Sequence, residues 1–371
     1  MMMNQPTIDR SNTLGMADFL GVAEGCWQGT DMAITLALEK GWNWTSHNLS
    51  EAVDRNRFTT YADLIVGYGE EYPLSQPAQP VAELEVLSPA AGYKVRMGAR
   101  ADITLRGALF DTSTPVVLRE GWNWIGFPLY NATTLDAALS GYEAQEGDAL
   151  VGLDAFAIHD GTCWRGSLTS LSPGQSYLMY SGRGGQFCWQ SLSLPSARSR
   201  RYVSPLQAED AAWQVDIHAY PDVMSVVAEV KAGDGISLAE GSCYVGAFCG
   251  GECRGVGVWN DGLLFVNVHG DGPEPITFRL LDAEGGCYGS PESPVFQAQA
   301  LLGSCAEPYV LNFYTDEILD GMRPDVSEDN VVREVWYNMA GQRVSRPVSG
   351  VYVRQAIGAD GRVTSRKVTL P

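Results

Sequence analysis

The sequence predicts an all-β protein built from small modules in series. Glycine and proline are abundant, with 41 and 19 residues, and aromatic residues make up 10% of the chain. This composition favours short strands joined by tight turns over long helices. A chain of 371 residues also exceeds one small β domain, since domains typically have about 150 residues. We therefore expect several β modules in tandem.

Charge and hydropathy argue against two classes of partner. Lys and Arg number 25 against 44 Asp and Glu, a formal net charge of −19, so the surface repels phosphate backbones and anionic lipid heads. We expect no nucleic-acid partner. No apolar run approaches the roughly 18 residues that a membrane-spanning segment needs, so we also expect no membrane insertion.

Residues 1–32 are interpreted as an N-terminal remnant or extension. The opening MMMNQPTIDR is polar, and no uninterrupted apolar segment of a secretory signal precedes Thr35. This opening is compatible with a truncated start, so that a signal peptide would lie upstream of the given sequence.

An internal repeat organises the first half of the chain. LALEKGWNW at 36–44 recurs as VLREGWNW at 117–124, and LSPAAGYKV at 87–95 recurs as LSPGQSYLM at 171–179. The first marker recurs after 80 residues and the second after 84. Two markers that recur in the same order at nearly constant spacing indicate a duplication. We predict two GWNW repeat modules, at residues 33–112 and 113–190.

The paired tryptophans of each copy have two interpretations. Trp42 and Trp44 are expected to share one face of an extended chain with the leucines that precede them, and Trp122 and Trp124 likewise share a face. Large aromatic residues at a period of two mostly form a core, and we favour this interpretation. Stacking of the indoles on sugar rings is the alternative.

The second copy carries a more specific resemblance. Its motifs EGWNWIGFPL and DGTCWRGSLTSLSPGQSYLMYS resemble repeated modules of large secreted and surface proteins from Bacteroidetes-type bacteria and some spirochaetes. The resemblance covers about residues 33–189 and implies an exported surface protein. Such modules share no catalytic residue set. The first copy departs from the pattern after GWNW, where TSHNLSEAV replaces IGFPLYNAT.

A different pattern begins after the repeats. Residues 191–206 carry three arginines between serines and prolines and are interpreted as an exposed linker. From 207 to 315 short strands alternate with Gly-rich turns, as in YVGAFCGGECRGVGVW, and this predicts a β-sandwich module. The segment resembles a module common in the same surface proteins. Residues 316–330 are acidic, contain Pro324 and are interpreted as a second linker.

The last residues, 331–371, contain the segments VWYNMAGQRV, GVYVR and RKVTL, with a hairpin expected at Ala359–Gly361. These segments resemble the C-terminal sorting domain of cargo for the type IX secretion system. The candidate sorting elements are Gly341, Gly350 and Lys367. The resemblance implies recognition by the secretion apparatus and a location outside the cell or on the outer cell surface. The alternative is an ordinary small terminal β domain.

Two of the eight cysteines form a candidate disulfide. The second repeat contains Cys163 and Cys188, whereas residues 33–110 contain no cysteine. Cysteines gained together in one module are most simply a pair that lies side by side in its sheet. A bond across this loop of about 25 residues would stabilise by roughly 3 kcal/mol in the chain-entropy model. The alternative is two unrelated thiols in the core.

No local catalytic motif appears in the chain. It lacks a phosphate-binding P-loop, an H-E-x-x-H zinc motif and a G-x-S-x-G nucleophile elbow. We therefore assign no catalytic, cofactor-binding or metal-binding residues and expect no cofactor. The hypothesis is a non-enzymatic exported surface protein that acts in adhesion, glycan binding or as a scaffold, with an extracellular glycan or protein as partner. The alternative is the C-terminal accessory part of a secreted hydrolase whose catalytic domain lies upstream.

Overall fold

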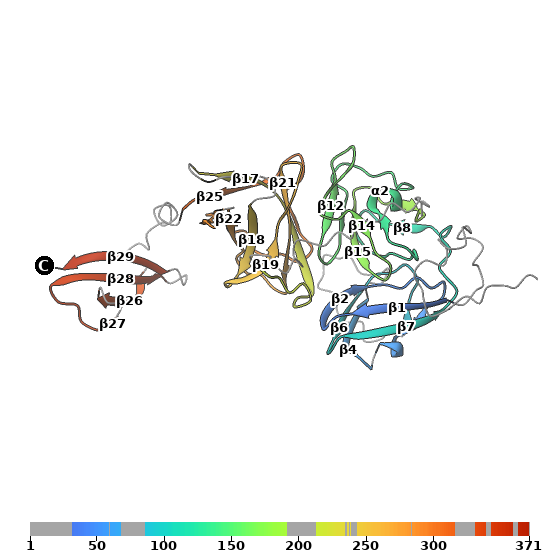
Figure 1. The fold of residues 1–371 in the computed structure, drawn as a ribbon, viewed down its shortest axis with the longest axis horizontal. Helices are drawn as coiled ribbons and strands as arrows, with labels where there is room; N and C mark the ends of the chain where they lie inside the picture. Colours follow the sequence, from blue (N-terminus) through green and yellow to red (C-terminus); the bar gives the residue numbers. More distant parts are fainter. Residues whose placement is uncertain are drawn as a thin grey trace, which may run out of the picture. The chain divides into compact units, whose positions relative to one another are not determined.

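The computed structural model describes residues 32–58, 60–67, 86–190, 213–233, 236, 238, 243–282, 284–315, 331–338, 343–358 and 363–370. Their regular structure is almost entirely β-strand in many small sheets, which confirms the all-β fold class (Figure 1). The chain divides into two compact units, a first that ends at Tyr314 and a second that begins at Thr315. Both expected linkers, 191–206 and 316–330, lie outside the described residues.

The first repeat copy forms three small sheets. Its strands are β1 (Met32–Leu38), β2 (Gly41–Thr45), β3 (Val53–Asp54), β4 (Ala62–Gly67), β5 (Val86–Leu87), β6 (Tyr93–Met97) and β7 (Ala101–Gly107), with a 3-10 turn η2 (Arg55–Arg57). Strand β1 pairs antiparallel with β7, the order β2-β6-β4 makes a three-stranded sheet, and β3 pairs with β5. Alternate residues of β1 are buried with Phe58 and Val95 in the core of this module, as its period of two requires.

The second copy is built around a five-stranded sheet. Its strands are β8 (Val116–Leu118), β9 (Gly121–Gly126), β10 (Thr133–Thr134), β11 (Ala149–Val151), β12 (Phe156–His159), β13 (Trp164–Gly166), β14 (Ser170–Leu171), β15 (Ser176–Ser181) and β16 (Gly185–Phe187). The large sheet has the order β13-β12-β11-β15-β9, while β16 pairs with β8 and β10 with β14.

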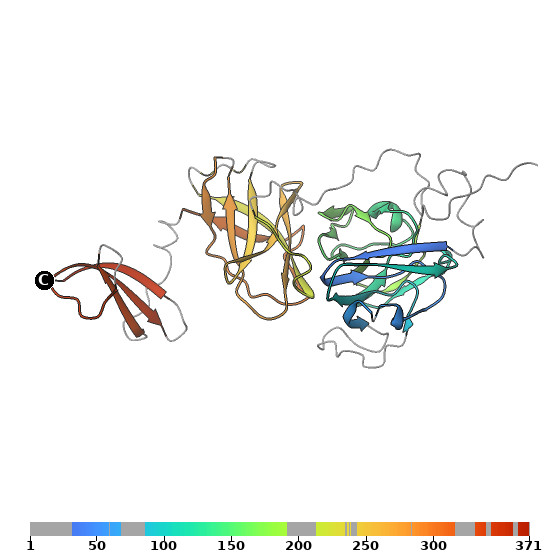
Figure 2. The same cartoon turned by 60° about the horizontal axis from the view of Figure 1, so that its bottom comes forward.

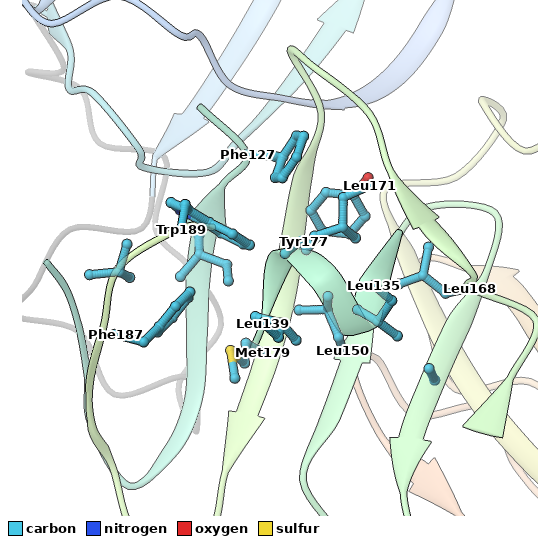
Figure 3. Close-up of a cluster of buried hydrophobic side chains, with 14 of the residues drawn as sticks. Phe127, Leu135, Leu139, Leu150, Leu168, Leu171, Tyr177, Met179, Phe187 and Trp189 are labelled. Carbon is cyan, nitrogen blue, oxygen red and sulfur yellow. The ribbon is translucent and has the colours of Figure 1, made fainter. Parts of the chain in front are cut away.

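One short helix closes the core of this second module. It is α2 (Leu135–Ala138), with Thr134 at its N-cap. Figure 3 shows α2 placing Leu135 and Leu139 against the sheet, near Leu150 and Met179. The remaining labelled aromatic side chains, Phe187 and Trp189 among them, belong to the same buried cluster.

Residues 222–313 form a two-layered β-sandwich (Figure 2). Its strands are β17 (Asp222–Ala232), β18 (Tyr244–Cys249), β19 (Glu252–Val256), β20 (Val258–Asn260), β21 (Leu263–Gly270), β22 (Thr277–Leu281), β23 (Cys287–Gly289), β24 (Leu301–Leu302) and β25 (Tyr309–Phe313). One sheet has the order β20-β21-β17-β24, with β25 also paired to β17, and the other has the order β19-β18-β22-β23.

The first of these sheets is buried on both faces. In β21, Leu264, Val266 and Val268 point into the sandwich core. Phe265 points to the opposite face, into a separate apolar cluster that also contains Trp44 and Trp124 of the two repeats. We call this cluster the junction. Its buried members are Trp44, Trp124, Ala149, Val151, Phe156, Ile158, Leu178, Val223, Val227 and Phe265. The two repeat modules and the sandwich are therefore packed into one unit.

The second unit is a single antiparallel sheet. It contains β26 (Val331–Asn338), β27 (Arg343–Val344), β28 (Gly350–Gly358) and β29 (Val363–Leu370), in the order β27-β26-β28-β29 (Figure 1). Gly350 begins β28 opposite Leu370, and Lys367 lies in β29 opposite Val353. Gly341 and the expected hairpin at Ala359–Gly361 lie outside the described residues.

Candidate functional site

The Gly and Asn of each GWNW motif build the same tight turn. Gly41 and Gly121 adopt left-handed φ values of +95° and +92°, which favour glycine. The Asn43 side chain accepts a hydrogen bond from the Glu39 backbone N–H at 3.0 Å and donates one to the Glu39 carbonyl at 2.8 Å. Asn123 makes the same pair of bonds to the backbone of its own copy. The motif therefore changes the chain direction between two strands.

This turn corrects the expected placement of the tryptophans. Strand β1 pairs with β7, whereas β2, after Gly41, pairs with β6 in another sheet. Leu36 and Leu38 consequently enter the core of the first module, while Trp44 enters the junction. The leucines and tryptophans do not share a face, because the alternation is interrupted by the left-handed glycine.

The LSP segments of the two copies form matching loops. The Ser88 backbone N–H donates to the Tyr93 hydroxyl at 2.6 Å, and the Ser172 N–H donates to the Tyr177 hydroxyl at 3.0 Å. Burial raises the pKa of both phenols, so each hydroxyl stays protonated and neutral. Each loop is thus held by a buried tyrosine five residues after its serine.

The two copies bind each other reciprocally through these elements. The Ser46 backbone N–H donates to the Gly174 carbonyl at 2.9 Å, and the Gly126 N–H donates to the Ala90 carbonyl at 2.7 Å. Gly126 follows Ser46 by 80 residues and Gly174 follows Ala90 by 84, so the four residues occupy equivalent repeat positions. Two isolated β-bridges, Thr45 with Gln175 and Ala91 with Ile125, also join equivalent positions of the two copies in this reciprocal way. The GWNW strand of each copy thus meets the LSP loop of the other, as in an isologous dimer.

Close approach at this contact requires a glycine. A Cβ added at Gly126 would lie 2.5 Å from the Ser46 Cβ and 2.7 Å from the Ala91 carbonyl oxygen. Both distances are shorter than van der Waals contact, and the second neighbour is backbone. The two repeat modules could not pack at this distance with a larger residue at position 126.

The second tryptophan of each motif is buried at the junction. Trp44 is 4% and Trp124 9% exposed, and their rings meet edge to face with centroids 4.6 Å apart. The Trp44 Nε1–H also donates to the carbonyl of Pro221, which directly precedes the sandwich strand β17, at 3.0 Å. The expected burial is confirmed for these two residues, but they pack between modules rather than inside one. Trp42 and Trp122 are half-buried.

A buried ion pair lies between the two tryptophans and the sandwich. The Lys94 side chain is 3% exposed, and its Nζ lies 5.5 Å from the Trp44 ring centroid and 5.2 Å from that of Trp124. The same Nζ donates to Asp222 Oδ1 at the start of β17. The equivalent position in the second copy is Leu178. Only the first copy supplies a cation at this position. The sandwich strand β17 can therefore form this ion pair with the first repeat and not with the second.

The segment before β17 docks on the first tryptophan of the first copy. The Trp42 backbone N–H donates to the His218 carbonyl at 2.7 Å, and the Trp42 carbonyl lies 2.6 Å from His218 Nδ1, which therefore carries the proton. A Cβ added at Gly41 would lie 2.3 Å from the His218 carbonyl oxygen. Gly41 thus has a second role that Gly121, with no neighbour within 4 Å, does not have.

One buried histidine on the sandwich side of the junction is unpaired. His269 is fully buried, and neither ring nitrogen has a hydrogen-bond partner. Burial, with a smaller contribution from the neighbouring His218, lowers its pKa to about 3. The ring is consequently neutral over the ordinary range of pH.

The described residues contain no group of three or more His, Cys, Asp or Glu side chains that could hold a metal ion. Within the same ranges, no helix is long and apolar enough to cross a membrane. Comparison with protein-family models, curated proteins and solved structures finds no match to this chain.

The two cysteines of the expected pair flank strands of two different sheets. Cys163 directly precedes β13 in the five-stranded sheet, and Cys188 directly follows β16, which pairs with β8. Both are free thiols, Cys163 exposed and Cys188 half-buried, and the Cys188 Sγ lies 3.4 Å from the Ser113 carbonyl oxygen. The sequence analysis expected them side by side in one sheet, whereas they flank strands of two sheets. Their pairing stays a prediction.

Proposed function

We propose that the protein is a non-enzymatic, exported surface scaffold, in which three β modules form one rigid body and the second unit is a signal for type IX secretion. The observation that supports this proposal is that the repeat motif lies in the turns and contacts that join the modules. The Gly, Asn and second Trp of GWNW shape turns and fill the junction, as Asn43 and Trp44 illustrate. Side chains buried to this degree hold the modules together.

Rigidity follows from the chemistry of the junction. Interfaces between domains of one chain are commonly polar, and relative motion is then expected. Here the interface combines an apolar cluster, reciprocal backbone hydrogen bonds and the Lys94–Asp222 ion pair. Such a body keeps a bound partner at a fixed distance and orientation. The partner that we infer is an extracellular glycan or protein, since a net charge of −19 repels polyanions.

Calorimetry of the full chain tests the scaffold. We expect the two repeats and the sandwich to unfold in one transition whose calorimetric and van't Hoff enthalpies agree, because each module loses its junction partners when another unfolds. Separate transitions for the repeats and for the sandwich would contradict a rigid body.

Deletion of residues 331–371 tests the export signal. Protease treatment of intact cells of the producing bacterium should degrade the full chain and spare the deleted one, which is expected to remain inside the envelope. A matched control is Val117→Ser, at a side chain that is 70% exposed in the first unit, and this variant should be displayed normally. Surface display of the deleted chain would contradict the sorting role. The thermal transition of the first unit should be the same with and without these residues, so that loss of display cannot be attributed to misfolding.

A further inference from the structure

The outer edge of the GWNW strand in the first repeat is covered by the chain itself. Strand β2 lies at the edge of its three-stranded sheet, and antiparallel pairing points the backbone groups of alternate residues away from the neighbouring strand. Trp42 is such a residue. Its N–H donates to the His218 carbonyl at 2.7 Å, and its carbonyl accepts from His218 Nδ1 at 2.6 Å. One histidine thus satisfies both outward groups.

A tight turn presents this histidine. The Oδ1 atom of Asp216 accepts a hydrogen bond from the His218 N–H at 3.0 Å, and the Asp216 carbonyl accepts one from the Ala219 N–H at 3.2 Å. Both bonds lie within residues 216–219, so the turn is held by its own contacts. We call these residues the Asp-x-His turn. It is a compact ligand for the edge of a strand.

The second repeat has the same strand edge. Strand β9 lies at the edge of the five-stranded sheet, and its Gly126 N–H points away from that sheet, toward the Ala90 carbonyl of the first repeat. Alternation along the strand places the N–H and the carbonyl of Trp122 on the same outward side. Among the described residues, no hydrogen-bond partner is found for these two groups. Trp122 occupies the repeat position of Trp42.

The space beside this edge differs between the copies. Gly41 and Gly121 have nearly the same left-handed φ, so an added Cβ points in the same direction in both turns. At Gly41 that Cβ would lie 2.3 Å from the His218 carbonyl oxygen, whereas at Gly121 no atom of the described residues lies within 4 Å. The place that His218 takes at the first repeat is therefore open at the second, as far as the described residues extend.

An aromatic pair borders the open edge. The rings of Trp122 and Tyr180 meet edge to face with centroids 5.2 Å apart, and both side chains pack against the junction. In the first copy the Arg96 guanidinium lies 5.7 Å from the Trp42 ring centroid instead. The second edge is thus continuous with an established interface and has a neutral border. An apolar residue beside the histidine, such as Ile217 in this chain, suits this border better than a charged one.

We propose that the Trp122 edge binds an Asp-x-His turn of another protein, in the way that the chain's own turn binds Trp42. The histidine carbonyl of the partner accepts from the Trp122 N–H, and its Nδ1–H donates to the Trp122 carbonyl. Uncovered strand edges are ready templates for binding a second chain. The site deepens the proposed scaffold function by naming the chemistry of its partner, and it rests on that function.

The occupant is a different protein rather than a second copy. The Asp-x-His turn of each molecule is already bound to its own Trp42 through two hydrogen bonds. The turn and Trp42 belong to one chain, so this contact has a high effective concentration that a contact between two molecules lacks. A second copy would have to open its own junction to offer the turn.

A synthetic peptide of residues 214–221, QVDIHAYP with both ends capped, is the probe. Two neutral hydrogen bonds give weak binding, so the peptide is titrated into the full chain by calorimetry up to millimolar concentration. We expect saturable binding and slower hydrogen exchange of the Trp122 amide in the complex. The Trp42 amide should exchange slowly throughout, because it is already bonded. His218→Ala in the peptide should weaken binding by about tenfold.

A pair of glycine variants locates the site. Gly121→Ala places a methyl group where the histidine carbonyl of the partner would lie, so it should abolish binding. The matched control is Gly285→Ala, in the turn between β22 and β23, where φ is +85° and no atom of the described residues lies within 4 Å of an added Cβ. This variant carries similar backbone strain and should bind the peptide as the parent does. Protection of the Trp122 amide in the parent tests the same contact without a substitution.

Several outcomes would overturn the site. These are no saturable binding, equal binding by Gly121→Ala, slow exchange of the Trp122 amide in the free chain, or protection confined to other segments. A parent dimer that Gly121→Ala dissociates, seen by sedimentation, would assign the edge to a second copy instead. Absence of peptide binding with one calorimetric transition would reject the site and leave the scaffold intact. Separate transitions for the repeats and the sandwich would reject the scaffold itself.

Discussion

The ring of Trp44 meets the ring of Trp124 edge to face, with centroids 4.6 Å apart and planes inclined by 70°. These residues occupy the same position in two copies of one repeat. They therefore pair with each other across the contact that joins the copies, and both belong to the junction together with Phe265 of the sandwich. A single sequence motif, used twice, thus supplies two of the ten buried residues of the junction that joins the three modules.

Truncation of a junction tryptophan should destabilise the first unit strongly. Trp124→Ala removes a large buried side chain, and we expect the free energy of unfolding to fall by about 3–5 kcal/mol in urea denaturation. Trp122→Ala, the neighbouring control, should have a smaller effect because Trp122 is half-buried. A double-mutant cycle with Trp44→Ala should give a coupling of about 0.5–1.5 kcal/mol for the ring pair. If Trp124→Ala instead left stability unchanged and abolished binding to a glycan array, the sugar-stacking alternative would be correct.

Alanine at the two repeat glycines should separate turn strain from docking. Gly41→Ala and Gly121→Ala both place a side chain at a left-handed φ, so each should lose about 1 kcal/mol or more from backbone strain. Only Gly41→Ala also drives a methyl group into the His218 carbonyl. We expect Gly41→Ala to lower the melting temperature clearly more than Gly121→Ala. Equal shifts would show that the segment around His218 is not docked on the first repeat.

Removal of the buried cation tests the junction ion pair. Lys94→Met leaves the Asp222 carboxylate without its partner, and breaking such a pair typically loses about 3–5 kcal/mol. Asp222 is 20% exposed, so we expect a value at the lower end. The double variant with Asp222→Asn should recover part of the loss, measured by urea denaturation, because no unpaired charge remains. An additive double variant would mean that the two residues are not coupled.

The sequence predicted local features better than the assembly. The repeat and the strands follow from periodicity and turn residues, which act over a few residues. The junction follows from contacts between distant segments. Lys94 was missed as a site residue, although one signal was present: it occupies a strand position that is Leu178 in the other copy. A charge that replaces an apolar residue at a repeated, alternating position can indicate a buried partner such as Asp222.

Two further residues show why the rest was not predictable. Gly41 ends the alternation that placed leucines and tryptophans on one face, and only its φ of +95° reveals the change of sheet. The docking of His218 on Trp42 joins residues 176 positions apart, and the Trp42 side of both hydrogen bonds is backbone, which carries no sequence signal.

Acidification should weaken the first unit through His269. Its pKa is about 3 in the folded protein and 6.5 as the ordinary value, so the unfolded chain binds a proton that the folded chain does not. The stability is fully present above pH 6.5 and is lost as the pH falls toward 3, by roughly 1.4 kcal/mol for each pH unit. His269→Leu removes this titration, so the difference in unfolding free energy between the parent and the variant should change by that slope between pH 6 and about pH 4 in urea denaturation series. Carboxylates shared by both proteins cancel in the difference. A parent and variant whose stabilities run parallel over this range would show that His269 is not buried in neutral form, and that the sandwich face of the junction is open to water.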